Sequence, residues 1–165
     1  MDAERRRAID YLDAQEGTGP VPVLDARGAM ELLRDARRIA VVGASPHPSR
    51  PSNDVMAYLL RQGYDCVPVN PNHREVLGRP VFATLEDAVA AGGPFDVVDV
   101  FRRAESTPAV AESAVRTGCR ALWLQLGIVN WEAAAIAHAG GLTVVMDRCT
   151  AIEHRRLRLA TRDGG

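Results

Sequence analysis

IAVVGASPHPSRPSN, from Ile39 to Asn53, is the stretch of sequence that decides the fold. The four apolar residues at 39–42 are too few for a helix and are typical of a strand buried on both faces, as in a parallel sheet. The run ends at Gly43, and small or turn-forming residues continue to Ser52. A helix is then predicted up to a stop at Gly63, because apolar residues recur at helical spacing: Val55, Met56, Leu59 and Leu60. The stretch therefore predicts a strand, a loop and a helix.

This unit is typical of a phosphate-binding site. A glycine lets backbone N–H groups approach an anion, and the start of a helix supplies unpaired N–H groups and a positive dipole end. A dinucleotide-binding loop, however, has the pattern GxGxxG, with an acidic residue about 20 residues further on. Here the loop has Gly43 alone, and the next predicted strand, 64–69, ends in Asn70 and Pro71 without a carboxylate. Ordinary NAD binding is disfavoured, which leaves a phosphate or nucleotide site, or a tight turn without a ligand.

Strands and helices alternate along the chain. Beyond the first two, strands are predicted at 95–101, 120–125 and 142–146, with a short extended piece at 80–82. Helices are predicted at 2–15, at 25–38, from Thr84, at 106–117 and at 130–139. This alternation predicts an α/β fold with right-handed crossovers. We expect a doubly wound, Rossmann-like parallel sheet of five strands in the order 3-2-1-4-5, with helices on both faces. Residues 1–24 would form an N-terminal helix and linker, and residues 25–165 one domain.

Composition and charge exclude several classes of protein. The chain has 165 residues, enough for one domain with a substantial core, and its net charge of −1 gives no broad basic field of the kind that nucleic-acid binders show. No apolar run approaches the roughly 18 residues of a membrane helix. The three cysteines, Cys66, Cys119 and Cys149, show no CxxC spacing and follow no signal segment. We therefore expect a cytoplasmic protein that binds neither nucleic acid nor membrane.

The strand ends select candidate ligand contacts, because ligands of such sheets bind at the carboxyl ends of the strands, where the strand order reverses. Every basic residue apart from histidine is arginine, whose guanidinium can hold phosphate with two hydrogen bonds. Arg50 lies in the loop itself. Phe101, Arg102 and Arg103 follow a buried strand, and could hold an adenine face and phosphates together. The alternative is that Phe101 belongs to the core and the arginines are solvated.

Six blocks of sequence together resemble the small coenzyme A-binding proteins of the Rossmann type, which are similar to the N-terminal domain of the succinyl-CoA synthetase alpha subunit. These blocks are VVGAS, VPVNP, VLGRPVF, DVVDVFRR, ALWLQLGIVN and GLTVVMDRCTAIEHRRL, in order from about Asp25 to Leu157. The resemblance implies that the 3′-phospho-ADP part of CoA lies across the point where the strand order reverses. Relatives carry a lysine after the Asn-Pro pair, where this chain has Asn72 and His73, so Arg50 or Arg74 is the expected contact of the 3′-phosphate.

The resemblance and the strand ends together give a set of cofactor-binding residues. The phosphates would meet the first loop, the adenosine would border the end of the second strand, and the adenine or pantetheine would pass the third. Gln125 would add a polar lining at the fourth strand end. The full set is Gly43, Ala44, Ser45, Arg50, Ser52, Asn53, Asn70, Pro71, His73, Phe101, Arg102, Arg103 and Gln125.

The function expected from these residues is binding of CoA or an acyl-CoA by a module, carrier or sensor. No set of nucleophile, base and orienting residue is visible, and no metal-ligand spacing, so a complete enzyme is not expected. Two alternatives stay open, an NADP(H)-binding oxidoreductase and a subunit of an acyl-CoA ligase. A third is a structural domain whose N-terminal helices mediate assembly. A protein partner or a homo-oligomer is left open, as is a reaction of Cys149 with the CoA thiol.

Overall fold

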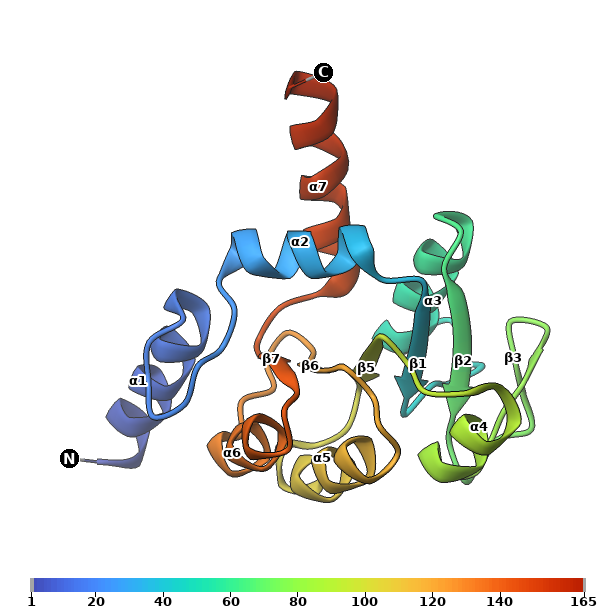
Figure 1. The fold of residues 1–165 in the computed structure, drawn as a ribbon, viewed down its shortest axis with the longest axis horizontal. Coiled ribbons are helices and arrows are strands. Elements are labelled where there is room, and N and C mark those ends of the chain that lie inside the picture. The colour runs from blue at the N-terminus through green and yellow to red at the C-terminus, as the bar shows by residue number, and fades with distance from the viewer. Residues whose placement is uncertain (1, 165) are drawn as a thin grey trace.

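The computed structural model describes the backbone of residues 2–164 and the side chains of residues 2–162. A parallel five-stranded sheet lies at its centre, with its strands in the order β2-β1-β5-β6-β7 (Figure 1). The strands are β1 (Arg38–Val42), β2 (Asp65–Val69), β5 (Val97–Val100), β6 (Ala121–Leu124) and β7 (Thr143–Val145). Their short, buried apolar runs match the strands predicted from the sequence, and the predicted α/β fold is confirmed.

At the β2 edge of the sheet, Phe82 adds one further parallel pairing. This residue forms an isolated parallel bridge with Val69, and its N–H donates to the carbonyl of Pro68. Numbered along the chain, the five strands of the sheet lie in the order 2-1-3-4-5; with this bridge counted as the third strand, the order becomes the predicted 3-2-1-4-5 pattern, extended by β7. The strand β5, numbered third from the sequence, is then the fourth and pairs with β1. The strand order therefore reverses between β1 and β5.

Helices cover both faces of the sheet (Figure 1). The sheet has a hydrophobic core on each face. Alternate residues of β1 point into the two cores: Ala40 and Val42 into one, and Ile39 and Val41 into the other. The first core includes buried residues of α4 (Leu85–Gly92), α5 (Thr107–Arg116) and α6 (Trp131–Ala139). The second includes α2 (Ala26–Asp35), α3 (Pro51–Arg61) and α7 (Thr150–Gly164). A 3₁₀ turn at Ala104–Ser106 precedes α5, and β3 (Glu75–Val76) and β4 (Arg79–Pro80) form a small hairpin.

The two ends of the chain differ in how well they were predicted. The N-terminal helix is present as α1 (Ala3–Glu16), capped by the Asp2 side chain, which accepts from the N–H of Arg5. The linker after it runs beside β7, since the N–H of Leu24 donates to the carbonyl of Val144. No helix is predicted from the sequence after the last strand at 142–146, but the C-terminal segment forms the helix α7. Among residues 2–164, no helix combines the length and apolar character needed to span a membrane.

Candidate functional site

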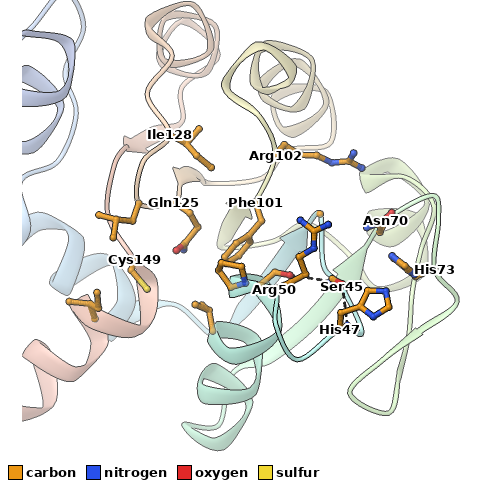
Figure 2. Close-up of a pocket in the computed structure, with 16 residues that line it drawn as sticks. Ser45, His47, Arg50, Asn70, His73, Phe101, Arg102, Gln125, Ile128 and Cys149 are labelled. Carbon is orange, nitrogen blue, oxygen red and sulfur yellow. Dashed lines mark hydrogen bonds between the residues drawn. The ribbon is translucent and has the colours of Figure 1, made fainter. Parts of the chain in front are cut away.

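A pocket of about 620 Å³ opens at the carboxyl ends of the strands, where the strand order reverses (Figure 2). Nine of the thirteen residues predicted to bind a cofactor line it: Gly43, Ser45, Arg50, Ser52, Asn70, His73, Phe101, Arg102 and Gln125. The remaining lining comes from residues outside that set: His47, Pro51, Val55, Leu126, Ile128, Cys149 and Ile152. The other four predicted residues, Ala44, Asn53, Pro71 and Arg103, do not line the pocket. Ligand contact stays a prediction for the nine that line the pocket, and the position of the other four outside its lining disfavours such contact.

Gly43 is required at the end of β1 for a steric reason. Its φ of 88° lies in the left-handed region, and a Cβ atom at this position would come within 2.5 Å of the carbonyl oxygen of Phe101. The Gly43 N–H donates to the carbonyl of Val69, at 2.8 Å. The glycine therefore allows β1 and β5 to approach at the pocket, and its own N–H is used within the sheet.

The loop after Gly43 is held by its own polar side chains. The N–H of Ser45 donates to the hydroxyl of Ser52 at 3.1 Å, and the amide of Asn53 donates to the carbonyl of Ser45 at 3.0 Å. From β2, the amide of Asn70 donates to the carbonyl of Ala44 at 2.9 Å. Ala44 and Asn53 are thus buried supports of the loop. The N–H groups of Ser45 and His47 are used within the loop, and Pro51 at the start of α3 has no N–H, so the expected cradle of free backbone N–H groups is reduced.

Cationic and imidazole side chains gather at one end of the pocket. Arg50 precedes α3, and Arg102 follows β5. Neither guanidinium forms an ion pair with a side chain among residues 2–162. The rings of His47 and His73 lie edge to face with their centroids 6.0 Å apart. This polar end, together with the N-terminus of α3, suits an anion such as a phosphate.

The opposite end of the pocket is largely apolar. Phe101, Ile128 and Cys149 lie across the pocket from Asn70 and His73 (Figure 2), and Val55 and Ile152 add to the apolar lining. Ile128 belongs to the loop after β6, and Ile152 to the helix that sequence reasoning missed. The available signal was the block GLTVVMDRCTAIEHRRL, in which apolar residues continue after the last strand. An apolar chain, rather than a second charged group, fits this end.

A buried carboxylate lies beneath Gln125. Asp99 in β5 has no exposed surface, and burial raises its pKa from 3.8 to about 7, although two hydrogen bonds oppose this. The amide of Gln125 donates to Asp99 Oδ1 at 2.5 Å, and the hydroxyl of Thr150 donates to Oδ2 at 2.9 Å. The same Gln125 amide nitrogen lies 3.0 Å from the Thr150 hydroxyl. Asp99 was not singled out from the sequence, because alternation along an apolar strand does not reveal which polar residue meets a ligand site.

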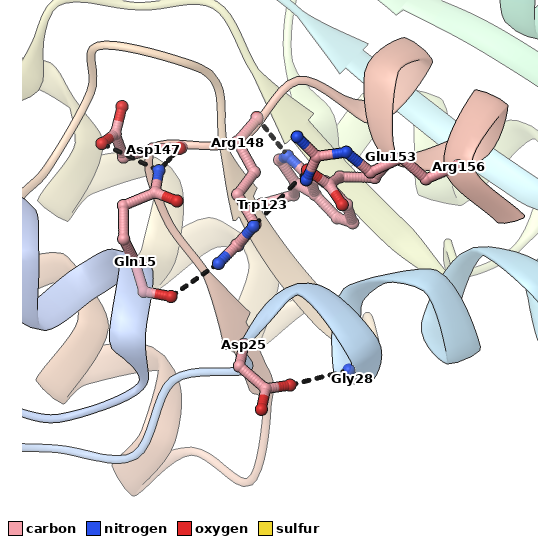
Figure 3. Close-up of polar contacts among 8 residues, drawn as sticks. All are labelled: Gln15, Asp25, Gly28, Trp123, Asp147, Arg148, Glu153 and Arg156. Atoms are coloured by element: carbon pink, nitrogen blue, oxygen red, sulfur yellow. Dashed lines mark hydrogen bonds and ion pairs between the residues drawn. The ribbon is translucent and has the colours of Figure 1, made fainter.

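The N-terminal helix supports the loops after β6 and β7 (Figure 3). Buried Arg148 donates through Nη2 to the backbone carbonyl of Gln15 at 2.6 Å, and its Nη1 lies 3.4 Å from Glu153 Oε1. The Gln15 amide donates to the carbonyl and to the carboxylate of Asp147. Asp147 Oδ1 in turn accepts from the N–H of Gly127 at 2.7 Å. These contacts hold the backbone of the segments that follow Gln125 and precede Cys149.

The arrangement is that of a binding site for a ligand with an anionic part and an apolar part. Among the described residues, no group of three or more His, Cys, Asp or Glu side chains is placed to hold a metal ion. The buried carboxylate of Asp99 is covered by Gln125 and Thr150. The side chains that face the pocket therefore supply charge complementarity, hydrogen bonding and apolar contact.

Comparison with known proteins identifies the family to which this chain is similar. Residues 37–155 match the model of a family described as a CoA binding domain. The uncharacterized protein YneT of Bacillus subtilis is 41% identical over 124 residues, which are 75% of this chain and 90% of that protein. A hypothetical protein from Pyrococcus horikoshii OT3 has a similar solved structure, with a TM-score of 0.77, 39% identity, and coverage of 86% of this chain and 97% of that one. For a Thermus thermophilus structure the TM-score is 0.74 and the identity 35%, with coverage of 81% and 99%.

Proposed function

The chain belongs to the family of CoA-binding domains, and from this premise we propose that it binds CoA or an acyl-CoA in the pocket at the carboxyl ends of its strands. The 3′-phospho-ADP part occupies the polar end, beside Arg50, His73 and Arg102. The pantetheine arm, with or without an acyl group, occupies the apolar end beside Phe101 and Ile128. In this role the protein acts as a module, carrier or sensor.

One observation carries the proposal, which is the division of a single pocket into an anion-binding end and an apolar end (Figure 2). CoA has the same division, since its phosphates lie at the nucleotide and its pantetheine arm is uncharged. The guanidinium groups of Arg50 and Arg102 have no protein carboxylate as partner among the described residues, so a ligand phosphate meets two uncompensated positive charges.

An NADP(H)-binding oxidoreductase is the alternative to be tested beside it. The residue at the end of β2 is Asn70, whose amide already holds the loop carbonyl of Ala44, so no carboxylate grips the ribose hydroxyls of NAD there. A 2′-phosphate in NADPH would instead meet arginine or histidine. NADPH is therefore the competitor that separates the two ligand classes.

The test is calorimetric titration of the ligand-free protein with CoA, acetyl-CoA, dephospho-CoA, NAD and NADPH. We expect CoA or acetyl-CoA to bind best and dephospho-CoA more weakly, because it lacks the 3′-phosphate. Arg102→Ala removes a charged hydrogen bond of about 1.5–3 kcal/mol, which weakens CoA binding by roughly 10- to 150-fold. Arg103→Ala is the matched control, since Arg103 is the exposed neighbour outside the pocket, and it should bind CoA like the unaltered protein.

Two outcomes would contradict the proposal. Tighter binding of NADPH than of CoA would move the search to a reductase. Equal losses of CoA affinity in the Arg102→Ala and Arg103→Ala variants would show that Arg102 contributes general electrostatic attraction and not a contact in this pocket.

A further inference from the structure

Cys149 is the one thiol among the described cysteines that meets the pocket. It lies half-buried between β7 and α7 and lines the apolar end. Cys66 in β2 has no exposed surface, and Cys119 before β6 is 5% exposed, so both belong to the packed core. A sulfur-reactive ligand in the pocket therefore has a single protein partner.

A second feature points to a polar ligand group at the same end. Gln125 is only 4% exposed and lines the pocket, and its Nε2 is used by Asp99 and Thr150. Its Oε1 accepts no hydrogen bond from any described residue, so an acceptor is left for a ligand. Thr150, which contacts Gln125, directly follows Cys149 in the chain. An unpaired amide oxygen and a thiol thus meet the ligand in one region.

With CoA bound as proposed, the order of groups across the pocket brings its terminal sulfur towards this region. Figure 2 shows Asn70 and His73 on one side of the pocket and Cys149 on the other, with Gln125 and Phe101 between them. A nucleotide at the polar end extends its pantetheine arm past Phe101 towards Ile128 and Ile152. The arm carries amide N–H groups that suit the free oxygen of Gln125, and it ends in a thiol.

We propose that Cys149 is a site of thiol–disulfide exchange with the disulfide form of CoA, an inference that rests on the proposed binding of CoA. The Cys149 thiolate attacks one sulfur of the bound CoA disulfide. The bond between the two CoA sulfurs breaks, a bond forms between Cys149 Sγ and the retained CoA, and the second CoA leaves as a thiolate that takes up a proton. The proton lost by Cys149 passes to water, and the CoA disulfide is the oxidant.

The surroundings of Cys149 determine how fast this exchange proceeds. Burial raises the pKa of its thiol, while the backbone N–H groups of Ile152 and Ala151, in the first turn of α7, act in the opposite direction. Little thiolate is present at neutral pH, so the rate rises with pH. A CoA disulfide held by its nucleotide keeps its sulfur close to Cys149, which offsets the small thiolate fraction. A disulfide without the nucleotide has no such advantage.

The test is intact-protein and peptide mass spectrometry of the full chain after incubation with CoA disulfide at pH 7 and pH 8.5. We expect one CoA per chain, located on the Cys149 peptide, removed by dithiothreitol and formed faster at the higher pH. The Cys149→Ser variant loses the adduct, and the Cys119→Ser variant keeps it. Excess 3′-phospho-ADP, which fills the polar end alone, slows labelling. Glutathione disulfide labels at least about tenfold more slowly at equal concentration.

Each other outcome has a definite meaning. If calorimetry shows that the protein binds CoA but no adduct forms on Cys149, the exchange proposal is wrong and the proposed function stands. If glutathione disulfide labels Cys149 as fast as CoA disulfide, or 3′-phospho-ADP does not slow labelling, the thiol is merely accessible and the proposal is wrong. If CoA does not bind at all, the proposed function fails first, independently of any labelling.

Discussion

Replacement of Asp99 by asparagine should remove a large pH-dependent component of the stability. Asp99 has no exposed surface and is held only by the Gln125 amide and the Thr150 hydroxyl. Its pKa is about 7 in the folded chain, against an ordinary value of 3.8. One pKa unit corresponds to about 1.4 kcal/mol, so ionising this group in the folded chain costs roughly 4 kcal/mol more than in the unfolded chain.

The sign of the effect follows from proton binding. Between about pH 4 and pH 7 the folded chain keeps the Asp99 proton and the unfolded chain has lost it, so the folded state binds more protons. The free energy of unfolding should therefore fall as pH rises through this window, and stop falling above about pH 7. His154 acts in the opposite direction, because burial lowers its pKa, but it is present in both proteins. The difference between the unaltered protein and Asp99→Asn isolates the carboxylate.

The assay is urea unfolding of both proteins at half-unit intervals from pH 5 to pH 8.5, followed by circular dichroism. The variant should gain stability relative to the unaltered protein as pH rises, by up to about 3 kcal/mol over this range. Asp87→Asn, an exposed carboxylate in α4, is the control and should show no such relative gain. A constant difference between the Asp99→Asn and unaltered proteins at every pH would refute the reasoning.

Two further substitutions, each with a control, test the contacts that hold the backbone around the pocket. Gly43→Ala should cost about 2–4 kcal/mol, because it combines a positive φ with a Cβ 2.5 Å from the Phe101 carbonyl. Gly63→Ala, with a similar φ and no atom near its Cβ, should cost only about 1–2 kcal/mol, so equal melting-temperature losses would contradict the proposed clash. Arg148→Met should cost about 3–5 kcal/mol in urea unfolding, because it leaves Glu153 buried beside a single exposed partner. Arg156→Met removes that exposed partner and should cost less than about 1 kcal/mol; a larger cost would show that Arg156 is the main partner of Glu153.

Most of the sheet could be predicted because its signals are local. The apolar run at 39–42, the stop at Gly63 and the cap at Asn130 each act within one turn of helix or one strand, and the structure has an element at each. The C-terminal helix α7 was missed because its exposed face is rich in arginine and reads as a solvated tail. Its buried residues, Thr150, Ala151, Glu153 and His154, include three polar side chains, so burial there depends on tertiary partners rather than on apolar spacing.

The candidate site, too, could be predicted only in part. Its loop residues were found because glycine, serine and asparagine at the end of a strand are a local pattern. Ile128 and Ile152 were not found, because an apolar residue that lines a pocket has the same spacing as one that packs in the core. Asp99 shows a related limit of prediction from sequence. A lone acid in a buried strand indicates only that partners exist, and those partners, Gln125 and Thr150, are 26 and 51 residues away in the chain.

The hydrogen bonds of Asp99 with Gln125 and Thr150 also affect which polar groups of a ligand can bind to Gln125. Above about pH 7, where Asp99 is ionised, it accepts hydrogen bonds and cannot donate, so Gln125 turns its Nε2 towards it and Thr150 directs its hydroxyl proton there. The amide oxygen of Gln125 then necessarily faces away from Asp99, as an acceptor. A ligand group that donates, such as the amide N–H of a pantetheine arm, is thereby favoured over one that only accepts, such as a carboxylate. We infer that the ionised form of Asp99 favours such a ligand without touching it, through the orientation of Gln125.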